Sequence, residues 1–287
     1  MIPNTSVKRS PFTFFILVYA LSIPFWVAGA VTSFQLLPGL PVSALMFVCP
    51  VAAAAILLYR ERKFAGVKQL LARALDFKRV TATIWYVPTL LLMPCIMALS
   101  FGALRLMGVP VPVPLFSVDS IGTILVLFVA IFFAALCEEL GWSGYALDPL
   151  QERFDALGAA LLIGGEWAMW HFVPLLQVPR SPVFIAWWSL GTVAARVIIV
   201  WLYNNTGRSV FIAALFHSMM NLTWQMFPIN GSYYDPRVTG LITAIVAAVV
   251  VTVWGPRTLT RYGTHSGKRR AQAAGREEGS GHVSIPQ

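Results

Sequence analysis

Long apolar runs constrain the fold of this chain more than any other feature of its sequence. A helix needs about 20 mostly apolar residues to cross the hydrocarbon core of a bilayer. Only 11% of the residues are charged, which is too little polar surface to cover a water-soluble globule. The sequence therefore predicts an all-α, polytopic integral membrane protein of about eight transmembrane helices, at 11–34, 41–59, 83–107, 121–146, 157–176, 183–203, 209–227 and 238–255.

The net charge of +9 is consistent with this class, because the Lys and Arg residues lie mainly in loops and tails. That distribution favours contact with anionic lipid headgroups and argues against nucleic-acid binding. If the N-terminus is cytoplasmic, 17 of the 21 Lys and Arg residues lie on the cytoplasmic side and three on the other side, with Arg196 inside a helix. We therefore expect both termini to be cytoplasmic. The basic chain shows no eukaryotic sorting signal, which favours a bacterial plasma membrane.

Two segments differ in composition from the apolar helices. Residues 60–80 are basic and carry leucines at helical spacing, so we expect them to lie along the membrane surface. After Gly255-Pro256 the chain becomes polar and lacks a hydrophobic face. The predicted organisation is a membrane domain over 1–257 and a basic, disordered cytoplasmic tail over 258–287.

Ionisable residues inside membrane helices require an explanation, because each costs about 2.5–3.5 kcal/mol near the bilayer centre on insertion scales. Taken singly, each is explained as well by a structural role, as a snorkelling side chain or in an ion pair that braces two helices, as by a functional one. The candidates for such an explanation in the predicted helices are Glu138, Glu139, Glu166, His171, Arg196, His217 and Asn221.

Several of these residues could converge on one water molecule. His217 and Asn221 are four residues apart, so they share one helix face. Glu138 could act as a base, while imidazole and carboxamide groups bind the water or hold an oxyanion. Glu138, His171 and His217 could instead ligate a divalent metal such as zinc. The residues fit both a metal site and metal-free hydrolysis.

Three short motifs follow one another in this part of the chain. They are EELGW from Glu138, WAMWH ending at His171, and HSMMN from His217 to Asn221. Their order and spacing resemble the CAAX-protease and bacteriocin-processing family of intramembrane proteases, which includes the prenyl-protein endopeptidase of eukaryotes. The family pattern is EExxxR, then FxxxH, then HxxxN or HxxxD. The resemblance covers roughly residues 120–225, the predicted family core.

The resemblance implies an intramembrane endopeptidase whose active site lies inside the helix bundle. It assigns Glu138 as the base that activates water, and Glu139 as its structural or assisting neighbour. Glu139 lies about 100° around the helix from Glu138, so it would orient neighbours. The rest of the implied site is formed by His171, His217 and Asn221. The implied substrates are membrane-tethered or lipidated (CAAX-like) peptides or proteins.

Two positions depart from the family pattern. Ser143 replaces the arginine of EExxxR and cannot supply its charge, and Trp167 replaces the phenylalanine of FxxxH. Arg196 is a candidate for the missing charge through a pair with Glu139; the alternative is a pair with Glu166.

Ser143 keeps a second function open, that of a proteolytically inactive scaffold or bacteriocin-immunity factor. A third alternative is a proton-coupled transporter, because intramembrane Glu and His residues also form proton relays.

Overall fold

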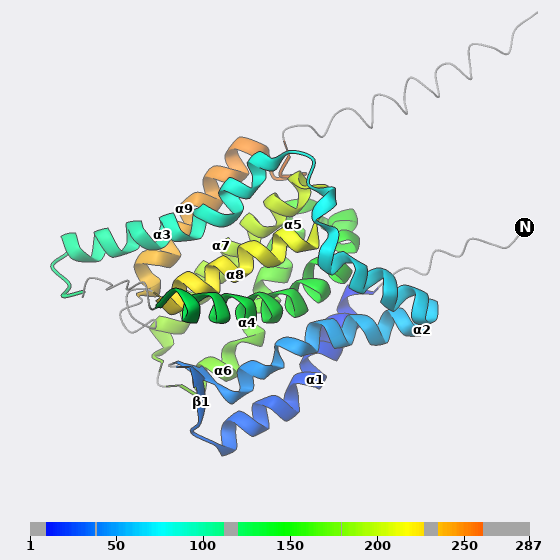
Figure 1. Cartoon of the computed structure of the whole chain (residues 1–287), viewed down its shortest axis with the longest axis horizontal. Coiled ribbons are helices and arrows are strands. Elements are labelled where there is room, and N and C mark those ends of the chain that lie inside the picture. Colours follow the sequence, from blue (N-terminus) through cyan, green and yellow to red (C-terminus); the bar gives the residue numbers. More distant parts are fainter. Residues whose placement is uncertain (1–9, 38, 112–119, 179, 227–234, 261–287) are drawn as a thin grey trace, which may run out of the picture.

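The computed structural model describes residues 10–37, 39–111, 120–178, 180–226 and 235–260 (Figure 1). Within these ranges the regular structure is almost entirely helical, which confirms the predicted all-α class. The α-helices are α1 (Pro11–Val31), α2 (Cys49–Ala72), α3 (Tyr86–Leu106), α4 (Ser120–Gly141), α5 (Leu147–Trp170), α6 (Phe172–Leu176), α7 (Pro182–Asn205), α8 (Val210–Met226) and α9 (Pro236–Trp254).

Shorter elements connect these helices. A small antiparallel ribbon follows α1 and pairs Gln35 with Pro41. The short elements are β1 (Gln35–Leu37), β2 (Leu40–Pro41), the 3-10 helices η1 (Val42–Val48), η2 (Arg73–Arg79) and η3 (Thr83–Trp85), and the π-helical turn η4 (Trp142–Ala146).

The helices of the described chain include six stretches that are long and apolar enough to cross a membrane: Pro11–Val31, Val42–Arg79, Thr83–Leu106, Ile121–Leu176, Pro182–Asn205 and Pro236–Trp254. The predicted spans 121–146 and 157–176 both fall within Ile121–Leu176. The predicted span 209–227 corresponds to α8, which has 17 residues. The polytopic class is therefore confirmed, whereas the count of eight spans stays a prediction.

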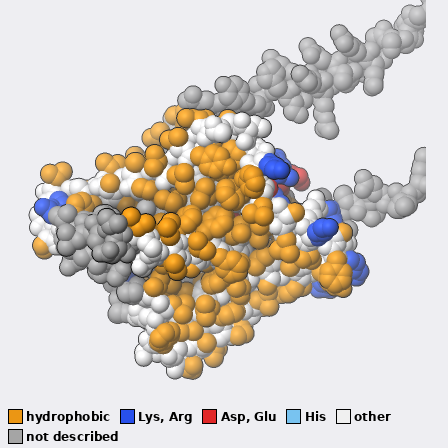
Figure 2. All heavy atoms as spheres, viewed as in Figure 1, with side chains coloured by type: hydrophobic (Ala, Val, Ile, Leu, Met, Phe, Trp, Pro, Cys, Tyr) orange, Lys and Arg blue, Asp and Glu red, His pale blue; other side chains and the backbone are white. Residues whose placement is uncertain are grey.

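The outer surface is suited to lipid contact. Figure 2 shows a face that is largely apolar, with Lys and Arg gathered toward its edges. Large apolar side chains such as Ile16, Val126 and Val129 point outward from their helices. Residues 1–9 and 261–287 lie outside the described residues, so the orientation of the termini and the disorder of the tail stay predictions.

The basic segment at 60–80 is not one straight helix. Helix α2 breaks at Lys63, where φ is 53°, then resumes and ends in η2. Exposed Phe64 and Leu71 lie in the same segment as the charged Lys68. Its position along the membrane surface stays a prediction.

The helices that carry the predicted site residues are connected by direct packing, with α7 between α5 and α8. Helix α4 packs against α2 and α8, α5 packs against α7, and α7 packs against α8 and α9. Helix α5 has a break at Asp155, and the backbone N–H groups of Ala156 and Leu157 donate to carbonyls at Arg257 and Pro256. The chain after α9 therefore caps the half of α5 that leads to His171.

A close contact between α4 and α2 depends on Gly141, the last residue of α4. A Cβ atom at this position would lie 2.6 Å from the backbone carbonyl of Pro50 in α2. No side chain can occupy that space unless the two helices separate. Since Gly141 follows Glu138 and Glu139 within one turn, this contact also sets where the acidic pair lies.

We expect Gly141→Ala to destabilise the protein by about 1–3 kcal/mol, because overpacking forces the backbone apart. Thermal unfolding of the detergent-purified protein, followed by circular dichroism, measures the effect. Gly165→Ala is the matched control, since a Cβ atom there would meet no described atom within 4 Å. Equal melting temperatures for the two variants would contradict the close-contact interpretation.

Candidate active site

A buried ion cluster is centred on Glu139, whose side chain is wholly inaccessible to solvent. Its Oε2 atom lies 2.8 Å from Nη1 of Arg196, which comes from α7. Its Oε1 atom accepts a hydrogen bond of 3.1 Å from Nδ1 of His217, which comes from α8. The hydroxyl of Ser143 also donates to Oε2. One carboxylate thus joins groups from α4, α7, α8 and the π-helical turn.

The partner of Arg196 is Glu139 and not Glu166, which decides between the two pairings that the sequence left open. The guanidinium also lies over the ring of Trp167, with Cζ 4.4 Å from the ring centroid. Its Nε and Nη2 atoms have no hydrogen-bond partner among the described residues. The carboxylate and the aromatic face therefore supply the contacts that compensate for burying this charge.

Ser143 lies in the π-helical turn that follows α4. A π-helical turn inserts an extra residue into a helix and is frequent at functional sites. Ser143 is buried, and its hydroxyl reaches the same oxygen of Glu139 that Arg196 contacts. The position that carries arginine in the family pattern therefore still contacts Glu139, while the charge comes from a different helix.

Trp167 connects the two adjacent glutamates. Its indole Nε1 donates a hydrogen bond of 2.8 Å to Oε2 of Glu138. Its ring packs edge-on against the imidazole of His217, with centroids 4.8 Å apart, and receives Arg196 on its face. Phenylalanine could make the ring contacts but has no N–H group to hold Glu138.

His171 is also held by Trp167, through the backbone. Its Nδ1 lies 2.8 Å from the carbonyl oxygen of Trp167. Because a carbonyl only accepts hydrogen bonds, this contact places a proton on Nδ1. In the neutral ring Nε2 is then left as an acceptor or ligand. Trp170 and Trp188 pack against the same imidazole and fix its plane.

A cavity of about 330 Å³ lies beside these groups. Among the described residues that line it, Glu138, His171 and Asn221 are three of the few polar ones. Most of the wall is apolar and is formed by residues such as Leu37, Met46, Phe47, Met93, Met97, Leu127, Ile131 and Trp188. An extended apolar group could enter this space and bring a polar bond to Glu138.

The five predicted site residues therefore divide into two groups. Glu138, His171 and Asn221 line the cavity, whereas Glu139 and His217 lie behind it in the ion cluster. This division suits one carboxylate that faces substrate and another that orients neighbours.

The predicted metal ligands are not assembled into one cluster. Among the described residues, no group of three or more His, Cys, Asp and Glu side chains is arranged to hold a metal ion. His217 directs Nδ1 to Glu139, while Glu138 is held by Trp167.

Sequence reasoning missed two contributions to the site. The indole N–H of Trp167 could have been suspected, because tryptophan adds a donor where the family pattern has phenylalanine. Arg180 and Gln225 also line the cavity, but nothing in their local sequence points to it.

Comparison with known proteins finds sequences similar to this chain, including the part that forms the site. A family model described as type II CAAX prenyl endopeptidase Rce1-like matches residues 120–223. The CAAX prenyl protease 2 of Methanococcus maripaludis is 26% identical over 279 residues, which cover 86% of this chain and 95% of the relative. The matched segment contains all five predicted site residues. The resemblance inferred from the three motifs is confirmed.

We expect Arg196→Ala to destabilise the protein as much as Glu139→Ala, by about 3–5 kcal/mol, because it leaves a buried carboxylate without its cation. Thermal unfolding in detergent measures both variants. Native-like stability of Arg196→Ala would contradict the assigned role of this ion pair.

A second variant tests whether the charge can be moved. In Ser143→Arg combined with Arg196→Ala, the new guanidinium would start one turn after Glu139. We expect it to recover most of the stability that Arg196→Ala loses. A double variant no more stable than Arg196→Ala would show that Glu139 needs its cation specifically from α7.

Proposed function

Because this chain is a relative of the type II CAAX prenyl endopeptidases, we propose that it is an intramembrane endopeptidase acting on membrane-tethered or lipidated substrates. The observation that carries the proposal is Glu138, a carboxylate held at the wall of a largely apolar cavity by Trp167. His171 and Asn221 line the same cavity. The relative from Methanococcus maripaludis is named as a CAAX prenyl protease, which supports a prenylated C-terminus as the substrate class.

In the proposed reaction Glu138 acts as general base toward one water molecule. It removes a proton as the water oxygen attacks the carbonyl carbon of the scissile bond. The imidazole of His171 can accept a hydrogen bond from the water through Nε2, and the carboxamide N–H of Asn221 can donate to the water or to the oxyanion. When the C–N bond breaks, the proton on Glu138 passes to the leaving amine. The products are a carboxylic acid and a new amino terminus.

The ion cluster supports this reaction without touching the substrate. Glu139 holds His217 and Arg196, and both of these contact the ring of Trp167. Trp167 in turn holds Glu138. We propose that Glu139 and His217 keep the base in position, which is the assisting role that the motif assigns to Glu139.

The inactive alternative rests on Ser143, which lacks the charge of the family arginine. The contact between Arg196 and Glu139 weakens that alternative, because the carboxylate has a guanidinium partner at 2.8 Å. A scaffold or immunity role would not require Glu138 to face a cavity. We therefore propose an active enzyme.

Loss of the base should abolish cleavage. We expect purified wild-type protein to release the C-terminal tripeptide from a farnesylated peptide with a CAAX end, and Glu138→Ala to lose at least about 100-fold in kcat, the lower part of the usual range for general bases. Mass spectrometry of the products measures both, with and without a metal chelator.

The natural substrates can be sought with the same variant. Cells that express wild-type protein or Glu138→Ala at matched levels are compared by counting new N- and C-terminal peptides of membrane proteins. Identical termini, together with no cleavage of the farnesylated peptide, would favour the scaffold alternative. Cleavage of other membrane peptides alone would change the proposed substrate class.

The indole hydrogen bond should matter for catalysis more than for binding. Trp167→Phe keeps an aromatic ring but removes a donor to a charged group, a bond of about 1.5–3 kcal/mol. We expect kcat to fall about 10-fold or more with KM unchanged. Trp142→Phe is the matched control, since the Nε1 of this buried tryptophan has no partner among the described residues. Equal kcat values for both variants would refute the role of the bond.

A further inference from the structure

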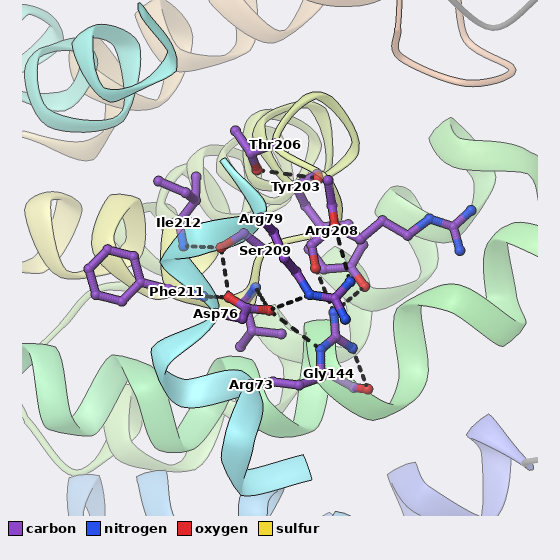
Figure 3. A network of polar contacts seen from close by, with 12 residues as sticks. Arg73, Asp76, Arg79, Gly144, Tyr203, Thr206, Arg208, Ser209, Phe211 and Ile212 are labelled. Carbon is purple, nitrogen blue, oxygen red and sulfur yellow. Dashed lines mark hydrogen bonds and ion pairs between the residues drawn. The ribbon is translucent and has the colours of Figure 1, made fainter. Parts of the chain in front are cut away.

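The helix η2, which follows the basic part of α2, connects the ends of several helices that carry the site. Figure 3 shows its side chains entering a polar network between the π-helical turn, the end of α7 and the start of α8. None of the network residues lines the cavity. Two of them, Arg73 and Asp76, make most of the contacts between elements.

Arg73 contacts three segments at once. Its Nη1 donates to the carbonyl oxygen of Gly144 at 3.0 Å, within the π-helical turn. Its Nη2 donates to the hydroxyl of Tyr203 at 2.9 Å, near the end of α7, and to the carbonyl oxygen of Arg208 at 2.6 Å, before α8. The planar guanidinium suits this role, because its donors have fixed directions.

Asp76 supplies acceptors for the start of α8. Its two carboxylate oxygens accept from the backbone N–H groups of Val210 and Phe211 and from the hydroxyl of Ser209, at 2.7–3.2 Å. Ser209 itself caps the N–H of Ile212. The first N–H groups of a helix have no hydrogen-bond partner within the helix. A carboxylate here therefore fixes the helix end, and its negative charge interacts favourably with the helix dipole.

The segments held by this network are those that supply the ion cluster. Gly144 follows Ser143 in the π-helical turn, and Tyr203 lies two turns after Arg196 on the same face of α7. His217 lies seven residues into α8 from Val210, about 10 Å along the axis at 1.5 Å per residue. Movement of α8 along its axis would therefore change the 3.1 Å contact between His217 and Glu139 directly.

We infer that Arg73 and Asp76 are positioning residues for the proposed peptidase reaction, acting through the ion cluster on Glu138. The inference rests on the proposed function. A mutation far from the reacting atoms that displaces a catalytic group by about 1 Å can lower the rate about 100-fold. The contacts of Arg73 and Asp76 with these helix ends would therefore affect catalysis.

The test compares kcat and KM for the farnesylated peptide among Arg73→Ala, Arg73→Lys, Asp76→Asn and wild-type protein. Folded protein is quantified by circular dichroism and gel filtration, so that rates refer to folded molecules. We expect each variant to lose about 10-fold or more in kcat with KM changed less than about 2-fold. Lys78→Ala, which removes an exposed charge from the same segment, should match wild type.

Three outcomes would overturn the inference. Wild-type kcat in folded Arg73→Ala or Asp76→Asn would show that the contacts of these two residues only stabilise the fold. Failure of Asp76→Asn to fold would show the same, because asparagine keeps the size and one acceptor oxygen of the side chain. A rise in KM alone would indicate substrate binding. Absence of cleavage by wild-type protein would instead count against the proposed function.

Discussion

The contact between the carboxylate of Glu139 and the guanidinium of Arg196 is the interaction on which the rest of the site depends. Both charges are buried, so separating them would leave each in an apolar environment at a cost of several kcal/mol. Because they come from α4 and α7, the pair fixes the spacing of these helices. His217 extends the same restraint to α8. The ring of Trp167 lies against these groups, and its N–H donates a hydrogen bond to Glu138. The ion cluster thereby helps to hold a carboxylate at the cavity wall.

In the proposed peptidase, this arrangement would separate two conflicting requirements. A base that works on substrate must be accessible, whereas charges that hold helices together should be excluded from solvent. Adjacent positions on one helix satisfy both, because successive side chains leave an α-helix about 100° apart. Glu138 lines the cavity and Glu139 faces the helix interfaces. The polar network of Arg73 and Asp76 adds a second restraint near the ends of the same helices.

Much of this could be predicted from sequence, and the limits have physical causes. Apolar length alone predicts the all-α membrane class, but it cannot count spans where α8 has 17 residues or where α4 and α5 run on through a π-helical turn. Residue type, spacing and the family resemblance select Glu138, Glu139, His171, His217 and Asn221 as site candidates. The partner of Arg196 was not decided, because it depends on how α7 rotates against α4. The hydrogen bond from Trp167 to Glu138 is not predicted, because the exchange of phenylalanine for tryptophan at this position is interpreted only as a change of aromatic ring.

The serine at position 143 has a consequence for how such proteins are found. A linear sequence pattern that requires arginine one turn after the second glutamate accepts the cation at that sequence position alone. In this structure the cation at the Glu139 carboxylate comes from α7, through a residue 57 positions away from Glu139. Chains with the charge placed this way would be rejected by the pattern or set aside as degenerate. Searches that accept a cation at either position 143 or position 196 would retain such chains.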